Sequence, residues 1–244
     1  MPASRGRVWY LPIAVVLGVG LSILVFQTLN GGTTDAEVLN QPFLTDRVLR
    51  HLELVFVSFG VVAVVGVPLG VAVAKSSRPL RVLVFTVANL GQALPSIGVL
   101  VLLYAFLGLG VWPSLIALSL YGLLPVLRNT MVGVQGVDPA AVEAARGMGM
   151  TAWQALTGVE LPLAAPVIFA GLRTALVLIV GTATLGNFIG GGGLGDVIAS
   201  GIDQSDRIVF VGAVMVATLA LLADWALSLV ERAVVPPRIT QSPG

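Results

Sequence analysis

The sequence predicts an all-α membrane protein, a bundle of about six membrane-spanning helices. Of its 244 residues, 57% are hydrophobic and only 10% are charged, against about 45–50% and about 25% in soluble domains. The mean hydropathy is +0.99, and the apolar residues occur in long runs without charge. This composition excludes an ordinary water-soluble enzyme and a disordered chain.

The first two predicted spans are separated by a polar stretch. Val8–Leu29 is a charge-free run that follows Arg5 and Arg7. A membrane span needs about 20 apolar residues, whereas the apolar core of a secretory signal has about 7–15, so we expect a retained span. The next charge-free run is Leu54–Ala74, and residues 30–51 are expected to connect the two.

The remaining chain provides four more spans. Val82–Leu127 has no charged residue, which is too long for one span and fits two, with a turn at Gly108–Pro113. The second of these is expected to end near Gly133. The fifth span is expected to begin after Pro162, and the sixth is Ile208–Val230.

Basic residues are divided unequally between the two predicted sides. With six spans both ends share one side, which holds nine of the thirteen Lys and Arg residues, against three on the other side. Cytoplasmic loops are rich in Lys and Arg. We therefore expect a multi-pass protein of the plasma (cell inner) membrane with both termini cytoplasmic. The expected parts are a cytoplasmic N-terminus at 1–7, one transmembrane domain at 8–235 and a cytoplasmic tail at 236–244.

Missing residue types exclude several kinds of chemistry. The absence of Cys excludes a disulfide framework, and the single histidine, His51, excludes a His-rich metal centre. The only lysine, Lys75, follows an alanine, so the chain has no Walker A loop and no ATPase of its own. A net charge of +1 gives no attraction to nucleic acid. We expect no catalytic residue, metal or cofactor in this chain.

The predicted cytoplasmic loop 134–160 contains helix signals. Asp138 followed by Pro139 is typical of a helix start, and a run rich in alanine around Glu143 continues to Gly147. Small side chains let another protein approach closely, and Glu143 adds an anchoring charge. The loop therefore has the character of a docking element; the alternative is a helix lying on its own membrane domain.

A second short helix is expected directly after the first. Thr151 and Gln154 have the spacing of a capping box, in which each side chain bonds the other residue's backbone. We expect this helix to end at Leu161-Pro162, before the fifth span.

This loop resembles the EAA loop of permease subunits in binding-protein-dependent ABC importers (type I, MetI-like family). That pattern is Glu-Ala-Ala, three residues, Gly, nine residues, Ile, one residue, Leu-Pro. The matching positions are Glu143, Ala144, Ala145, Gly149, Val159, Leu161 and Pro162, with Val for Ile as the one departure. The resemblance implies the MetI-like permease fold, with Glu143, Ala144, Ala145 and Gly149 in a cytoplasmic coupling helix that docks on a separate ATPase.

Flanking segments are similar to permeases for glycine betaine, carnitine and choline. The similarity covers roughly residues 50–205 and includes 94–96, 124–130, 136–139, 146–151, 170–175, 181–185 and 192–196. It implies an ATP-driven importer of quaternary-amine osmoprotectants, proline betaine among them. The alternatives are a related type I importer for another small solute, such as an amino acid, and a stand-alone membrane channel.

The family pattern also implies partners. They are two ATP-binding cassette subunits that hold ATP and Mg²⁺, a second permease subunit (the same or a paralogue), an extracytoplasmic substrate-binding protein and membrane lipid. The spans contain few aromatic residues and no obvious cluster that would cage a quaternary ammonium. We therefore expect high-affinity capture to belong to the binding protein.

Arg173 falls inside the fifth predicted span, where a charge is costly and needs a partner. We expect a structural ion pair, with Glu53 and Asp224 as candidate partners.

Polar residues near turns are candidates for the translocation path or a gate: Gln92, Ser96 and Asn187. Hydrogen bonding between helices is the alternative for the first two. The segment Gly190–Gly195 is expected on the external side, either as a re-entrant turn or as an ordinary flexible loop.

Overall fold

The computed structural model describes residues 13, 15–18, 20 and 38–235, with the side chains of 92 and 93 left out, and the regular structure of this part is helical. From residue 41 on, the α-helices are α3 (Gln41–Ala74), α4 (Arg78–Ala93), α5 (Ser96–Leu107), α6 (Val111–Gln135), α7 (Pro139–Gly147), α8 (Ala152–Ala155), α9 (Leu161–Ala183), α10 (Leu194–Gly201) and α11 (Asp206–Val234). Most of the expected span Val8–Leu29, and the ends 1–7 and 236–244, lie outside the described residues.

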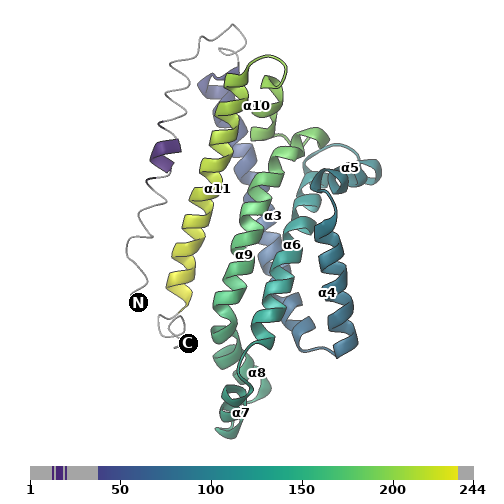
Figure 1. Ribbon diagram of the computed structural model, residues 1–244, viewed down its shortest axis with the longest axis vertical. Helices are drawn as coiled ribbons and strands as arrows, with labels where there is room; N and C mark the ends of the chain where they lie inside the picture. Colours follow the sequence, from purple (N-terminus) through teal and green to yellow (C-terminus); the bar gives the residue numbers. More distant parts are fainter. Residues whose placement is uncertain (1–12, 14, 19, 21–37, 236–244) are drawn as a thin grey trace.

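Four described helices are long and apolar enough to cross a membrane. They are α3, α6, a continuous helix over 152–189 that contains α9, and α11. The pair α4 and α5 adds a fifth span if it counts as one bent element. These helices lie side by side along the long axis of the molecule, except α5, which turns across it (Figure 1).

The first of these helices begins earlier than predicted. Residues 30–51 were expected to connect two spans, but α3 is already helical from Gln41. The Asn40 side chain accepts a hydrogen bond from the Phe43 N–H at 2.9 Å, and Pro42 occupies the first turn, where its missing N–H costs nothing. The polar start of α3 is thus a helix that extends beyond the apolar run, because it has its own cap.

The centre of the bundle consists of α3, α6 and α9, which pack closely through glycines. A side chain at Gly70 would come within 2.6 Å of Thr130 on α6, and one at Gly122 within 2.6 Å of Ile179 on α9. Leu118 and Ile179 are fully buried between these helices. Small residues permit this close approach, as is usual between membrane helices.

The third predicted span is broken. The axes of α4 and α5 differ by 96°, and the break falls at Leu94-Pro95, where the residue before proline is biased out of the helical conformation. The predicted turn before the fourth span is confirmed: Gly108 and Gly110 have positive φ angles, and α6 begins at Val111. It ends at Gln135, two residues beyond the expected end.

Candidate functional site

The short helix α7 stands at one end of the molecule, beyond the bundle (Figure 1). The Asp138 side chain caps it by accepting a hydrogen bond from the Ala140 N–H at 2.9 Å, as predicted. Gly149 follows it with a φ of +86°, a left-handed conformation that favours glycine. The predicted helix and its end are confirmed. Ala145 is buried and Val142 packs against the core of the bundle, so one side of the helix rests on the chain's own membrane domain.

The other side of this helix faces outward. Glu143 and Ala144 are exposed, Ala145 is buried against the chain, and Gly149 is exposed. Beside them Met148 is 74% exposed and Trp153 is 70% exposed. Two large apolar side chains next to a carboxylate at the tip of a protein are typical of a contact surface for a partner.

The second short helix does not end where predicted. The capping box is confirmed, with the Thr151 N–H donating to Gln154 Oε1 at 2.8 Å. The helix then continues through a π-turn at Leu156–Glu160 into α9, so that 152–189 is one helical element. Pro162 lies in the first turn of α9 and does not interrupt it, because the wider π-turn precedes it. The loop is therefore joined to the membrane helix without a break.

An ion pair ties this junction to α3. Glu160, the last residue of the π-turn, is only 3% exposed, and the Lys75 ammonium donates to its carboxylate. Lys75 is the C-cap of α3, at a helix end that favours a cation. This pair was not predicted, since the two residues are 85 positions apart. The only available signal was that the single lysine follows a charge-free run.

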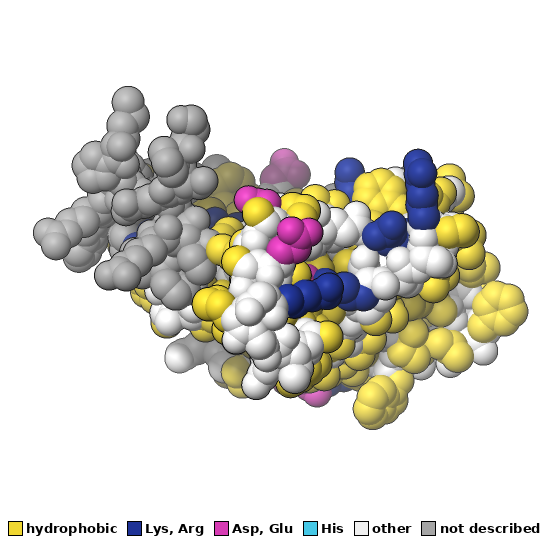
Figure 2. Space-filling view, turned by 90° about the horizontal axis from the view of Figure 1, so that it is seen from below, with side chains coloured by type: hydrophobic (Ala, Val, Ile, Leu, Met, Phe, Trp, Pro, Cys, Tyr) yellow, Lys and Arg dark blue, Asp and Glu magenta, His cyan; other side chains and the backbone are white. Residues whose placement is uncertain are grey.

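Lys and Arg side chains gather over part of the face that carries α7, with acidic side chains beside them (Figure 2). The ends of α3, α6 and α11 and the start of α4 lie at this end (Figure 1). These are the regions that contain Lys75, Arg78, Arg81 and Arg232. The distribution of basic charge in space thus follows the one expected from the sequence.

Arg173 on α9 contacts two carboxylates of α11. Its Nε lies 3.1 Å from Asp224 Oδ1, and its Nη2 donates to Glu231 Oε2 at 2.9 Å. Of the two candidate partners, Asp224 is therefore in place, but Glu53 is not. Glu53 pairs instead with Arg50, one turn away on α3, at 2.5 Å. Glu231 was not predicted, because it follows the apolar run that was expected to be the whole sixth span, whereas α11 continues to Val234.

The segment Gly190–Gly195 is packed tightly at the opposite end of the molecule. Three of its glycines, Gly190, Gly192 and Gly193, have φ between +77° and +91°. A side chain at Gly191 would meet Ser114 Oγ at 2.5 Å, and one at Gly195 would meet the Thr184 carbonyl oxygen at 2.0 Å. The segment turns the chain from a 3-10 helix (Thr184–Ile189) into α10, and it is not a loose loop.

Polar side chains from the start of α3 hold this segment. Arg47 Nη1 donates to Asp196 Oδ2 at 2.5 Å, and Arg50 Nε donates to the Gly191 carbonyl at 3.2 Å. Burial raises the pKa of the Asp196 carboxyl, and the Arg47 guanidinium opposes that rise. His51 is fully buried, with Nε2 3.2 Å from the Val180 carbonyl oxygen. These contacts explain why the early turns of α3 carry charged residues.

The structure describes the side chains of two of the three candidate path residues, Ser96 and Asn187. Ser96 is the first residue of α5, at the sharp bend, and Asn187 lies in the 3-10 helix. These two elements pack together through Leu100 and Ile189. The side chain of Gln92 lies outside the described part. No group of His, Asp or Glu suited to a metal occurs among the described residues.

The sequence matches the family model of the "Binding-protein-dependent transport system inner membrane component" over residues 66–236. It is 39% identical over 208 residues to the carnitine transport permease protein OpuCD of Listeria monocytogenes, covering 84% of this chain and 92% of that one. It is 41% identical over 201 residues to the choline transport system permease protein OpuBD of Bacillus subtilis, covering 81% and 88%.

A third relative is the osmoprotectant import permease protein OsmW of Salmonella typhimurium, 39% identical over 206 residues, with 82% of this chain and 95% of that one covered. Among solved structures, the fold is similar to a chain of the inward-facing MetNI methionine ABC transporter, with a TM-score of 0.71. That match covers 81% of this chain and all of the other at 24% identity, and it bears on the fold alone.

The helical bundle, the exposed helix after α6 and the family match agree with the resemblance noted in the sequence. This chain is a multi-pass membrane protein that belongs to the family of binding-protein-dependent transport system inner membrane components.

Proposed function

We propose that this chain is the permease subunit of an ATP-driven importer of quaternary-amine osmoprotectants such as glycine betaine, carnitine and choline. The observation that carries the proposal is similarity of about 40% identity, over four fifths of the chain, to permeases whose names state these substrates. These relatives are named for carnitine, choline and osmoprotectants, and none of the three is named as an amino-acid transporter.

The proposed partners follow from the family and from the surface at α7. Two ATP-binding cassette subunits would contact α7 and provide ATP, Mg²⁺ and hydrolysis, while this chain performs no hydrolysis of its own. A second permease subunit, identical or paralogous, would complete the path, and an extracytoplasmic binding protein would deliver the solute. The exposed Glu143, Met148 and Trp153 support docking at this end.

Orientation is part of the same proposal. The end that carries α7 contains Lys75, Arg78 and Arg81 and would lie in the cytoplasm, with the Gly190–Gly195 segment on the external side. The greater share of Lys and Arg on the α7 side supports this orientation, as for cytoplasmic loops in general.

Coupling between ATP hydrolysis and transport would pass through two connections. The first is the unbroken helix from α8 through the π-turn into α9. The second is the Lys75–Glu160 ion pair, which links the same turn to the end of α3. Movement of α7 by the ATPases would therefore reach α9 and α3 together, the two helices that pack with α6 at the centre of the bundle. Ser96 and Asn187 are retained as proposed path residues, along with Gln92.

Uptake of labelled glycine betaine, carnitine and choline tests this function. The complete transporter is expressed in salt-stressed cells that lack other betaine transporters, with this chain as wild type, as Glu143→Lys, or as Arg232→Glu. Arg232 is exposed at the same end, in the last turn of α11, and serves as the charge-reversal control. We expect uptake with wild type and the control, and loss of uptake with Glu143→Lys at equal protein levels.

Two outcomes separate the parts of the proposal. If betaine, carnitine and choline all fail to enter while the complex assembles and hydrolyses ATP, the substrate assignment is wrong. If Glu143→Lys transports as well as wild type, α7 is not the coupling element.

A further inference from the structure

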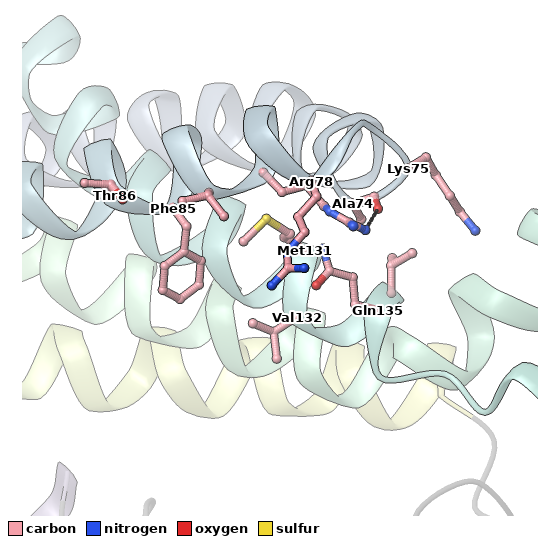
Figure 3. Close-up of a pocket in the computed structure, with 11 residues that line it drawn as sticks. Ala74, Lys75, Arg78, Phe85, Thr86, Met131, Val132 and Gln135 are labelled. Atoms are coloured by element: carbon pink, nitrogen blue, oxygen red, sulfur yellow. Dashed lines mark hydrogen bonds between the residues drawn. The ribbon is translucent and has the colours of Figure 1, made fainter.

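A pocket of about 650 Å³ opens between the end of α3, the start of α4 and the end of α6. Lys75 at the end of α3 and Arg78 and Arg81 at the start of α4 bring positive charge to it. Phe85 of α4 and Met131 and Val132 of α6 provide apolar wall, as Figure 3 shows. Neither the family match nor the relatives' names assign a role to this pocket.

The positive charge in the pocket is only partly compensated. Lys75 pairs with Glu160, and Arg81 Nη1 donates to a neutral acceptor, the Ala74 carbonyl, at 3.3 Å. In the described part of the chain, no carboxylate lies within 4.0 Å of the guanidinium of Arg78 or Arg81. Two charged guanidiniums beside apolar walls favour an anion, above all a phosphate, which accepts several hydrogen bonds from an arginine fork.

The start of α4 adds to this preference. Ser77 precedes the helix, and its side chain makes no capping hydrogen bond to the first turn. The N-terminal end of a helix carries partial positive charge and favours an anion. The turn at Lys75–Ser77 also follows directly on the apolar run of α3. The pocket therefore lies where the membrane-spanning part of α3 ends.

The surroundings of the pocket distinguish a lipid from a soluble anion. Its volume far exceeds that of a bare phosphate-sized ion, and part of its wall is apolar. On α4, next to Arg81, Val82 is 58% exposed and Leu83 is 60% exposed, surfaces suited to acyl chains. Basic pockets between membrane helices on the cytoplasmic side are sites at which anionic lipid headgroups bind.

We infer that this pocket binds one anionic phospholipid. Arg78 and Arg81 donate to the headgroup phosphate, and Phe85, Met131 and Val132 contact the glycerol and the first part of an acyl chain. The bound lipid holds the α3–α4 turn, which also carries Lys75 and so the ion pair to Glu160. This binding rests on the proposed orientation, with the α7 end in the cytoplasm, and does not depend on which solute is imported.

Native mass spectrometry of the purified, delipidated transporter complex tests the site. The complex is incubated with short-chain phosphatidylglycerol, short-chain phosphatidylcholine or inorganic phosphate, and the bound ligand is counted per permease subunit. The chain is wild type, Arg78→Gln/Arg81→Gln, or Arg232→Gln as a control at the same end. We expect phosphatidylglycerol to bind wild type and the control, and about thirtyfold more weakly to the double variant, from the usual contribution of two cationic side chains.

Each alternative result overturns the inference. Equal binding of phosphatidylcholine would mean that the site does not select the negative charge. Saturation by inorganic phosphate at the same concentration would assign the pocket to a soluble anion. Equal loss of phosphatidylglycerol binding in the double variant and in Arg232→Gln would mean that binding depends on general surface charge and not on this pocket. If the double variant fails to assemble, Arg81→Lys, which keeps the charge and loses the fork, is expected to bind phosphatidylglycerol more weakly than wild type, and unchanged binding overturns the site.

Discussion

The two ends of the molecule use small residues in opposite ways. At the α7 end, alanines and glycines leave a short helix whose Glu143 and Ala144 face outward. At the α10 end, Gly191 and Gly195 let the chain's own backbone pack against α6 and the 3-10 helix at distances no side chain would permit. Both stretches are rich in small residues, yet one provides a surface for a partner and the other an internal joint. What distinguishes them is the presence of nearby side chains that hold the segment.

The largest effect is expected from a methyl group at Gly195. In Gly195→Ala the new Cβ would lie 2.0 Å from the Thr184 carbonyl oxygen, which requires the backbone to move. We expect a loss of more than about 3 kcal/mol in the free energy of unfolding, at the upper end for overpacking. Gly181→Ala, on α9 with open space around it, is the matched control. Thermal unfolding in detergent measures both variants. Equal melting temperatures of Gly195→Ala and Gly181→Ala would contradict the tight packing of the glycine segment at the α10 end.

The Lys75–Glu160 pair should give the next largest effect. Lys75→Gln leaves the nearly buried Glu160 carboxylate without its cationic partner, which we expect to destabilise the protein by about 2 kcal/mol, less than for a fully buried pair because Lys75 is half exposed. The double variant Lys75→Gln/Glu160→Gln should recover part of this loss. Transport per ATP hydrolysed, measured in proteoliposomes, should fall in the single variant. An unchanged ratio would show that the pair only stabilises the fold.

At the α7 end we expect Gly149 to affect transport through its backbone conformation alone. Gly149→Ala forces alanine to a φ of +86°, which costs about 1–2 kcal/mol locally, while no neighbouring atom lies within 4 Å of the new Cβ. We expect reduced uptake with little change in the melting temperature of the bundle. Gly147→Ala, inside α7 with the same open surroundings, is expected to transport normally. Equal uptake by the two variants would contradict a role for the glycine conformation.

The smallest effect is expected for an exposed pair at the α10 end. Glu53 is half exposed and pairs with Arg50 one turn away. Removing it with Glu53→Gln should change stability by less than about 0.5 kcal/mol, as for surface pairs generally. Arg50→Gln should cost more, because Arg50 also donates to the Gly191 carbonyl. Comparison of the two melting temperatures tests whether Arg50 acts mainly through that glycine segment.

Features that depend on local sequence were predicted well. The start of α7 at Asp138, the capping box at Thr151 and the turn before α6 are all determined by residues within a few positions of each other. The family resemblance could likewise be recognised from the sequence, because all of its motif positions lie within one segment, from Glu143 to Pro162.

Most features that depend on distant residues were not predicted. The exception is the pair of Arg173 with Asp224, which a charge inside an apolar span indicated. Glu160 and Lys75 are far apart in sequence, as are Arg47 and Asp196, so neither pair has a local signal. The helical start of α3 was hidden by its charged residues, whose partners lie in the glycine segment. The continuity through Pro162 was missed because a proline was taken to end a helix, whereas a π-turn before it accommodates the ring.

The π-turn has a further consequence for the direction in which α7 points. A π-turn is equivalent to one residue inserted into an α-helix, and each residue of an α-helix turns the chain by about 100°. If one residue were deleted from Leu156–Glu160, the helix would become regular, and α7 would rotate by about that angle around the axis of α9. Glu143 would then point in a different direction relative to the membrane bundle. The extra residue therefore determines in which direction around the α9 axis α7 presents Glu143 to a partner protein.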